Sequence, residues 1–235
     1  MANYKKQNNY SYALGMSVVW ELFKYRLSSV KEVYFHTKHR NSDIKDKLLT
    51  EIQKSNIPYQ INDKIFNILS PKENCYVIAK FNKYETPILN NANHLVLVAP
   101  ENAGNLGTII RTSLGFGVTN IAIIGNAVDY FDPKVIRASM GAIFAVNIAH
   151  YNNFTEYHKG ASQHNIYPFM LQTDNLLLYT KIAKPYSLVF GPEGGGLSLD
   201  YLKVGTAIRI PHSNSIDSLN LTNAVSIALY EVNRN

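Results

Sequence analysis

The order of apolar and polar positions along the chain predicts alternating helices and strands. In its first third, the pattern predicts a helix over 8–27, a strand over 30–35, a helix over 43–55, a short strand over 58–61, a helix over 62–69 and a strand over 75–81. This alternation predicts a small α/β domain of about 80 residues, over 1–81. Residues 82–93 are polar and aperiodic, and we interpret them as a linker.

The remaining residues, 94–235, repeat the alternation with more apolar strands. The strands are expected over 94–99, 120–124, 166–171, 187–190 and 207–210, and the helices over 105–116, from Asp132-Pro133 onward and from Asn220 to the end. The continuous apolar runs 95–98 and 187–190 suit strands buried on both faces of a parallel sheet. The pattern alone therefore favours an α/β, Rossmann-like domain with ligand loops after the strands.

Composition indicates where in the cell a protein with this fold is expected to act. The chain has 235 residues, of which 46% are hydrophobic, and no apolar run reaches the length of a membrane span. The first ten residues have no apolar signal-peptide core. The single cysteine, Cys75, lies in an apolar run and is expected to be buried. These features predict a cytoplasmic protein that makes no use of a membrane.

The positive charge is concentrated at one end of the chain. Residues 1–90 hold 14 Lys and Arg against 8 Asp and Glu, whereas residues 91–235 hold 9 of each, so the net charge of +6 lies entirely in the first segment. A basic surface attracts polyanions and makes sequence-independent contacts to phosphates. A basic segment joined to a neutral one is better evidence for nucleic-acid binding than the overall charge.

Three segments of the second domain carry candidate chemistry. The first, residues 105–111, reads Asn-Leu-Gly-Thr-Ile-Ile-Arg, and it places Arg111 on a helix face of small residues that a substrate can approach. The second, residues 191–198, reads Gly-Pro-Glu-Gly-Gly-Gly-Leu-Ser and follows a strand. Its glycines permit unusual backbone angles and leave room for a flat ligand. Taken singly, the first segment is interpreted as an ordinary helix start and the second as a tight turn.

The third segment closes the chain. Ser218 and Asn220 lie where the last helix begins, and backbone N–H groups there lack partners and can hold a ligand. An apolar stripe follows at helical spacing, formed by Leu221, Val225, Ala228, Leu229 and Val232.

In their order and content, the three segments resemble the signature motifs of the SPOUT RNA methyltransferases, and within them the TrmH/SpoU ribose 2′-O-methyltransferases, over residues 94–235. The resemblance implies a C-terminal α/β domain with a deep trefoil knot, a homodimer through that domain, and S-adenosylmethionine as cofactor, with S-adenosylhomocysteine as product. It implies methylation of a ribose 2′-hydroxyl in RNA. The two-domain layout favours rRNA, and the ending Leu-Thr-Asn-Ala-Val-Ser favours tRNA.

The resemblance also implies roles for individual residues. It assigns the catalytic region to Asn105, Arg111, Glu193, Ser218 and Asn220, and cofactor binding to Leu171, Gly191, Ile210, Ser218 and Leu219. Arg111 is the family's proposed activator of the 2′-hydroxyl. Because a guanidinium keeps its proton to a pKa of about 12.5 or more, a phosphate clamp that stabilises developing negative charge is the alternative role. For Glu193 the alternative is capping of the next helix.

Other positions match the family less closely. Residues 1–81 resemble its substrate-binding domain, which is similar to a ribosomal-protein fold, but residues 70–74 read Ser-Pro-Lys-Glu-Asn where relatives often carry a Gly-rich segment. Arg137 lies in a recurrent segment that can contact RNA, a partner subunit or a structural acid. His212 replaces a common Met and is expected to line a loop, and the histidines lack the spacing of metal ligands.

Two alternatives to an RNA methyltransferase remain open. A non-catalytic RNA-binding protein with the same fold would be free to lose Arg111, Asn220 and the glycines, all of which are present. A nucleotide-binding oxidoreductase would need a G-x-G-x-x-G loop, which the segment 191–198 does not contain.

Overall fold

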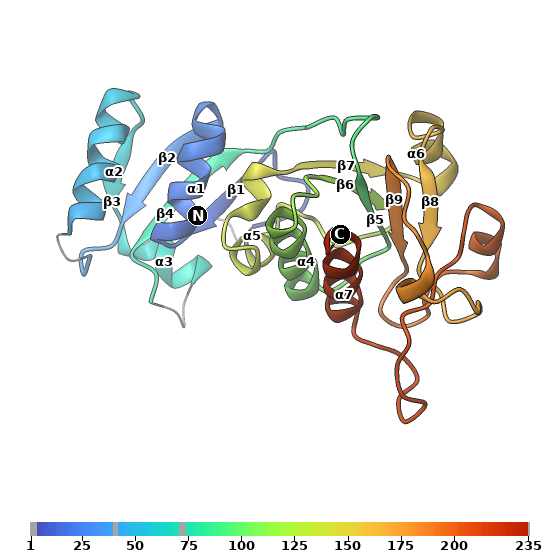
Figure 1. The fold of residues 1–235 in the computed structure, drawn as a ribbon. Coiled ribbons are helices and arrows are strands. Elements are labelled where there is room, and N and C mark those ends of the chain that lie inside the picture. Colours follow the sequence, from blue (N-terminus) through green and yellow to red (C-terminus); the bar gives the residue numbers. More distant parts are fainter. Residues whose placement is uncertain (1–3, 40–41, 71–73, 235) are drawn as a thin grey trace. The chain divides into compact units, whose positions relative to one another are not determined.

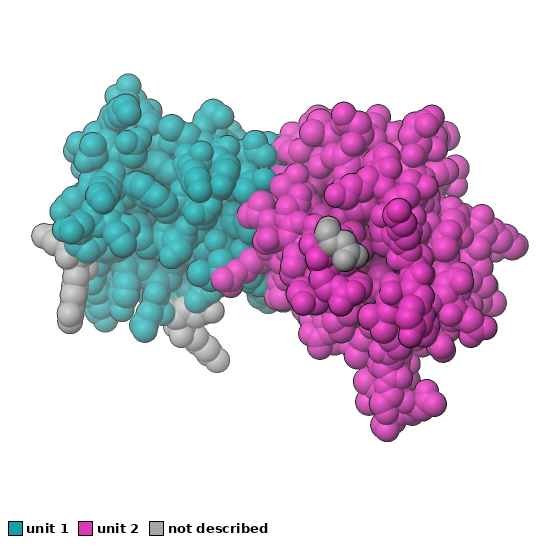
Figure 2. Space-filling view, in the orientation of Figure 1, with its two compact units in different colours: residues 1–84, 129–145 teal, residues 85–128, 146–235 magenta. Residues whose placement is uncertain are grey.

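The computed structural model describes residues 4–39, 42–70 and 74–234. The chain divides into two compact units (Figure 2). Unit 1 comprises residues 1–84 together with 129–145, and unit 2 comprises residues 85–128 together with 146–235. The chain therefore leaves unit 2, contributes a second segment to unit 1, and returns. The assignment of separate roles to the two parts of the chain stays a prediction.

Unit 1 is built on a four-stranded sheet in the order β1-β4-β2-β3 (Figure 1). Its strands are β1 (Tyr10–Leu14), β2 (Val30–Phe35), β3 (Tyr59–Ile61) and β4 (Val77–Asn82). Strand β4 pairs antiparallel with β1 and β2, and β3 pairs parallel with β2. The helices of this unit are α1 (Met16–Arg26), α2 (Asp43–Lys54), α3 (Asp63–Leu69) and α5 (Pro133–Ala138), with 3-10 turns η1 (Leu27–Ser29) and η2 (Ala142–Ala145).

The predicted helix over 8–27 is wrong in its first part, because β1 occupies Tyr10–Leu14. Gly15, with φ of 92°, separates this strand from α1. The strand is buried on both faces, since Ser11 and Ala13 are as inaccessible as their neighbours. It therefore lacks the polar alternation by which a half-buried strand is recognised. The other predicted elements of unit 1 form within a few residues of their expected bounds, and Cys75 is buried as predicted.

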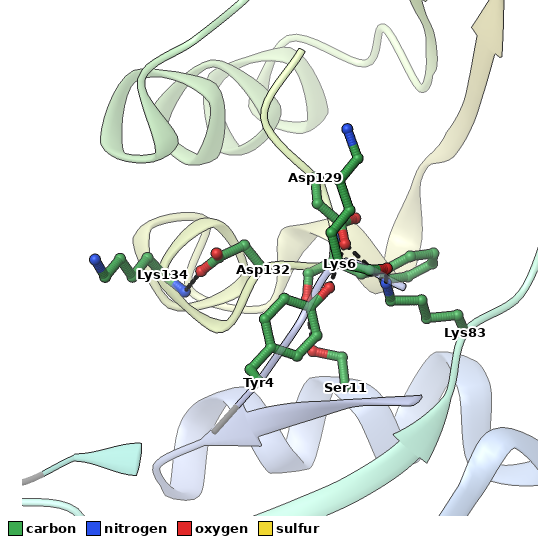
Figure 3. A network of polar contacts seen from close by, with 8 residues as sticks. Tyr4, Lys6, Ser11, Lys83, Asp129, Asp132 and Lys134 are labelled. Carbon is green, nitrogen blue, oxygen red and sulfur yellow. Dashed lines mark hydrogen bonds and ion pairs between the residues drawn. The ribbon is translucent and has the colours of Figure 1, made fainter. Parts of the chain in front are cut away.

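A polar network fastens residues 129–145 within unit 1 (Figure 3). Asp129 accepts hydrogen bonds from the hydroxyl of Tyr4 and from Nζ of Lys83, the latter at 2.7 Å. The hydroxyl of Ser11, in β1, donates to the carbonyl of Phe131 at 2.5 Å. Burial, and then the bond to Asp129, raises the pKa of Tyr4, so its phenol stays a donor. Residues 129–145 are thus held in unit 1 by the charged side chain of Asp129, which is largely shielded from solvent.

We expect Asp129→Asn to destabilise the protein by about 2–4 kcal/mol, because it leaves the Lys83 ammonium without its counter-charge. The Asp129 and Lys83 side chains are only 11% and 17% exposed, which limits rescue by water. Urea unfolding measures the loss. Asp200→Asn is the matched control, since Asp200 and Lys203 form an ion pair with both side chains more than 80% exposed. Equal stability of the two variants would contradict this account.

Unit 2 is built on a five-stranded parallel sheet in the order β7-β6-β5-β9-β8 (Figure 1). Its strands are β5 (His94–Val98), β6 (Asn120–Ile124), β7 (Asn147–Tyr151), β8 (Asn165–Pro168) and β9 (Tyr186–Phe190). Its helices are α4 (Ala103–Gly115), α6 (Phe154–Gly160) and α7 (Leu221–Asn233), with 3-10 turns η3 (Leu177–Tyr179) and η4 (Leu199–Lys203). Helices α4 and α7 pack against each other. The predicted α/β class is confirmed.

Four local expectations for unit 2 are corrected. Residues 207–210 form no continuous strand, because only Ile208 and Arg209 make isolated parallel bridges, to Phe169 and Leu176. Strand β8 ends at Pro168, earlier than the predicted 171. The pattern also missed β7 and α6, which are short elements that mix polar with apolar residues. Residues 85–93, interpreted as linker, pack in unit 2, where Leu89 N donates to Asn120 at 2.9 Å.

A buried polar cluster closes the amino end of this sheet. His94 and Ser187 are partners on β5 and β9, and both are inaccessible to solvent. Burial lowers the pKa of His94 to about 4, so its ring is neutral at physiological pH. Its Nε2–H donates to the Leu89 carbonyl at 2.9 Å, and its Nδ1 accepts from the Tyr157 hydroxyl at 2.8 Å. These bonds satisfy the buried polar groups at the amino end of the sheet. Ligand-binding groups are therefore expected at the carboxyl ends of the strands.

Candidate functional site

A pocket of about 300 Å³ lies beyond the carboxyl ends of β8 and β9 in unit 2. Its walls come from the chain after β8, the glycine loop after β9, and residues 208–224, which lead into α7. The carboxyl ends of parallel strands are the usual place for ligands in such sheets. Every residue that lines the pocket belongs to unit 2.

Backbone hydrogen bonds hold two of these walls together. Phe169 N donates to the Val189 carbonyl at 2.8 Å, and Met170 N donates to the Ile208 carbonyl at 2.9 Å. The rings of Phe169 and Phe190 stack with centroids 4.4 Å apart and planes 11° from parallel. Both phenylalanines line the pocket, so the stacked pair gives it an apolar surface next to the glycine loop.

The glycine loop depends on one glycine for its shape. A Cβ atom at Gly191 would lie 2.4 Å from the backbone carbon of Gly196 and 2.5 Å from the nitrogen of Leu197. The two ends of the loop therefore touch backbone to backbone, which only glycine permits. Gly196 has φ of +65°, a conformation that residues with a side chain rarely adopt. Gly194 and Gly195 face open space.

The structure brings the predicted cofactor-binding residues together. Leu171, Gly191, Ile210, Ser218 and Leu219 all line the pocket, although they come from three separate segments of the chain. Among them Leu171 is 45% exposed. Their common position is the geometry that the resemblance requires, while their individual roles stay predictions.

The predicted catalytic residues divide into two groups. Glu193 and Ser218 line the pocket, whereas Asn105, Arg111 and Asn220 do not. Asn105 is nevertheless joined to the pocket, since its Nδ2 donates to Oε1 of Glu193 at 3.2 Å. The other Glu193 oxygen accepts from the backbone N–H of Glu101 at 3.5 Å. Glu193 thus contacts the start of α4, rather than capping the helix that follows it.

Asn220 and Arg111 lie on the two packed helices. Asn220 is the N-cap of α7, and its side-chain oxygen accepts from the backbone N–H of Thr222 at 2.8 Å. Asn102 caps α4 in the same way, accepting from Asn105 N at 3.0 Å. Arg111 is an exposed residue of α4, two turns beyond that cap. Its side chain is not among those that line the pocket.

Sequence reasoning missed two polar residues of the pocket, Gln172 and Asp217. Each directly follows or precedes a residue that was predicted, so sequence proximity to Leu171 and Ser218 was the available signal. His212 lines the pocket as expected, and its ring Nδ1 lies 3.0 Å from the Ile210 carbonyl. Within the described part of the chain, no group of three or more His, Cys, Asp or Glu side chains is arranged to hold a metal ion. The helices described there also include none with the length and apolarity to cross a bilayer.

Comparisons with known proteins agree on one family. Residues 92–230 match the model of the SpoU rRNA Methylase family. An uncharacterized tRNA/rRNA methyltransferase of Synechocystis sp. is 32% identical over 145 residues, which cover 60% of this chain and 52% of that protein. The 23S rRNA (guanosine(2553)-2′-O)-methyltransferase RlmP of Bacillus subtilis is 24% identical over 178 residues, covering 74% of this chain and 71% of that protein.

Solved structures show the same fold over nearly the whole chain. The SpoU methyltransferase AviRb from Streptomyces viridochromogenes, in complex with AdoMet, superposes with a TM-score of 0.84 at 20% identity, covering 96% of this chain and 90% of that one. An AdoMet-bound rRNA methyltransferase from Sinorhizobium meliloti gives 0.81 at 24% identity, covering 96% and 87%. By sequence, the chain spans about half the length of the first curated relatives that it matches. The family match covers more than half of the chain, which therefore belongs to the SpoU rRNA methylase family.

Proposed function

We propose that this protein methylates ribose 2′-hydroxyl groups in RNA, with S-adenosylmethionine as the methyl donor. The observation that carries the proposal is the convergence of five predicted cofactor residues on one pocket at the carboxyl ends of β8 and β9. RlmP is by name a 2′-O-methyltransferase of 23S rRNA. Together with the two-unit chain, this makes rRNA the favoured substrate over tRNA.

The pocket fits the chemical groups of this cofactor. Its volume of about 300 Å³ is at the lower end of small-molecule sites. Phe169, Phe190 and Leu219 offer apolar surface for an adenine ring, and Asp217 and Gln172 offer polar atoms for hydroxyl or amino groups. The cofactor supplies an electrophilic methyl group on sulfur. The glycine loop and Ile210 would hold and orient it.

The remaining residues act on the RNA. In such a transfer the ribose 2′-oxygen would bond to the methyl carbon while the carbon–sulfur bond breaks, which would leave S-adenosylhomocysteine, and the hydroxyl proton would pass to water. Arg111 would stabilise negative charge on that oxygen or clamp the neighbouring phosphate. Glu193, fixed by Asn105 and Glu101, would hold the polar edge of the site in place. Alignment and electrostatics are the main contributions that such a site makes.

A homodimer would explain the position of Arg111. This residue is exposed on α4 and lies outside the pocket of its own chain. On α7, which packs against α4, Ile227 and Tyr230 are 41% and 58% exposed, as suits a face covered by a second subunit. We propose that the two subunits pair through this domain, that each Arg111 acts at the partner's pocket, and that the C-terminal segment forms a trefoil knot.

Unit 1 would capture the RNA in the cytoplasm. Its residues carry 16 Lys and Arg against 9 Asp and Glu, whereas those of unit 2 carry 7 against 8. The added segment 129–145 contributes two charges of each sign and leaves this contrast intact. We therefore propose that residues 1–81 bind the substrate RNA through its phosphates and that residues 94–235 carry the methyltransferase.

Methyl transfer to unmodified RNA tests the function. The purified protein is incubated with methyl-labelled S-adenosylmethionine and, separately, with rRNA and tRNA that lack modifications. Nuclease digestion and mass spectrometry then locate the label. Label on a ribose 2′-oxygen is expected in one pool. Label on a base would overturn the reaction, and cofactor and RNA binding without any transfer would favour a non-catalytic RNA-binding protein.

A further inference from the structure

An aromatic patch lies in unit 1 where β2 ends. We define it by the rings of His36, His39, Tyr59 and Tyr76, which rest on the buried rings of Phe35 and Phe66. His36 contacts Phe66 at 5.1 Å between ring centroids, and Tyr76 lies edge-on to both histidines, at 5.9 and 6.2 Å. Tyr59 and Tyr76 are 48% and 38% exposed. The patch thus offers several ring surfaces to solvent on one small area.

The backbone beneath the patch is fixed by hydrogen bonds. The backbone N–H and the hydroxyl of Thr37 both donate to Asp63, at 2.8 and 2.6 Å. These two bonds are the main reason why the pKa of Asp63 is lowered, and Asp63 therefore stays a charged acceptor at neutral pH. His36 N donates to the Tyr76 carbonyl at 3.0 Å, and His39 N donates to the His36 carbonyl at 2.9 Å. A ligand that binds the patch would therefore have little backbone left to order.

Lysines border the patch, together with the Asp63 carboxylate, which lies 3.3 Å from Nδ1 of His36. Lys38 lies between the two histidines and is exposed, and Lys64 is exposed in the first turn of α3. Lys45 lies over the Phe35 ring at 5.9 Å, with Nζ 3.4 Å from the His39 carbonyl. An apolar ring surface bordered by lysines complements a nucleotide, which has a flat base and a charged phosphate. A purely apolar protein partner would leave these charges unmatched.

We propose that the aromatic patch stacks unpaired bases of the substrate RNA, while Lys38 and Lys64 contact the adjoining phosphates. The proposal rests on the proposed function for the identity of the ligand as RNA. Base faces are hidden inside a duplex, so an exposed ring platform recognises loops, bulges or single strands. The patch therefore assigns to this protein a substrate that contains splayed-out bases, in contrast to a regular helix.

Binding of two fluorescein-labelled RNAs to the full chain tests the proposal. One probe is a single-stranded oligoadenylate, and the other is a blunt duplex of the same length. We expect tighter binding of the single strand, and Tyr76→Ala and His39→Ala should each raise its Kd about tenfold, within the range for loss of one stacked base. Tyr76→Phe keeps the ring and should bind like the wild type. Lys38→Ala should reduce the slope of log Kd against log salt by about 0.7.

Tyr25→Ala is the matched control, because Tyr25 is 40% exposed and also has a lysine, Lys24, over its ring at 4.7 Å. Its Kd should stay at the wild-type value. An equal Kd for Tyr76→Ala and Tyr25→Ala, or preference for the duplex, would overturn the inference. S-adenosylhomocysteine binding and rRNA methylation by the wild type are measured in parallel, so that failure of the methyltransferase proposal is seen separately from failure of the patch.

Discussion

Arg111→Ala is expected to lower the rate of RNA methylation about 10²–10³-fold, the usual loss when one preorganised donor to a developing oxyanion is removed. Arg111 does not line the pocket, so S-adenosylhomocysteine should still raise the melting temperature as it does in the wild type. Single-turnover methylation of rRNA measures the rate. A lower methylation rate with retained cofactor binding would indicate that Arg111 acts on the RNA and is not needed for folding.

Two further arginine variants sharpen this result. Arg111→Lys keeps the charge but loses the planar fork of donors, so a partial loss is expected for a bidentate phosphate clamp. Arg234→Ala is the matched control, because Arg234 is a half-exposed arginine of the same unit, paired with Glu231 at 2.8 Å. A fall in cofactor binding that parallels the fall in rate would make Arg111 a structural residue. An unchanged rate would remove it from the mechanism.

Mixing subunits tests whether Arg111 acts across a dimer. A subunit with Arg111→Ala keeps its pocket, and a subunit whose pocket is damaged keeps Arg111. If each arginine serves the partner's pocket, the mixed dimer contains one complete site, and activity returns on mixing two inactive proteins. If the arginine serves its own pocket, the mixture stays inactive.

The sequence pattern predicted the central strands of unit 2 better than it predicted the edge of the sheet and the boundaries of the unit. Strands such as β6 and β9 are mainly apolar and buried along their whole length, so hydrophobicity locates them, although β6 begins with Asn120 and β9 contains Ser187. Strand β7 lies at the sheet edge, contains Asn147 and His150, is only partly buried, and was missed. The packing of residues 129–145 in unit 1 depends on Asp129 meeting Tyr4 and Lys83, partners that are distant in sequence. Such pairings carry no local signal.

The same distinction applies to the site. Gly191, Ile210 and Leu219 were predicted because they stand in motifs of characteristic content, and the fold places them in one pocket. The contact between Asn105 and Glu193 was not predicted, although both residues were named, because it joins the start of α4 to the loop after β9. A motif identifies its members, whereas the distances between motifs are set by the packing of the whole sheet.

Gly191→Ala is expected to abolish cofactor binding. Its methyl group would overlap the backbone of Gly196 and Leu197, which form the opposite end of the glycine loop and have no rotamer by which to move away. The loop must open, at a cost of about 1–3 kcal/mol or more for overpacking, and the pocket wall that it forms is displaced. The melting temperature of Gly191→Ala should therefore fall, and S-adenosylhomocysteine should no longer raise it.

Gly194→Ala provides the control within the same loop, because a Cβ atom at Gly194 meets no atom within 4 Å. It should keep the wild-type melting temperature, and it tests whether the open side of the loop must stay clear for the ligand. If Gly194→Ala alone loses the ligand-induced shift, the cofactor lies against that open side, and the free space is itself part of the site. If Gly191→Ala binds S-adenosylhomocysteine normally, the backbone of the loop can adjust to the added methyl group. The shape of the pocket then does not depend on the contact of Gly191 with Gly196 and Leu197.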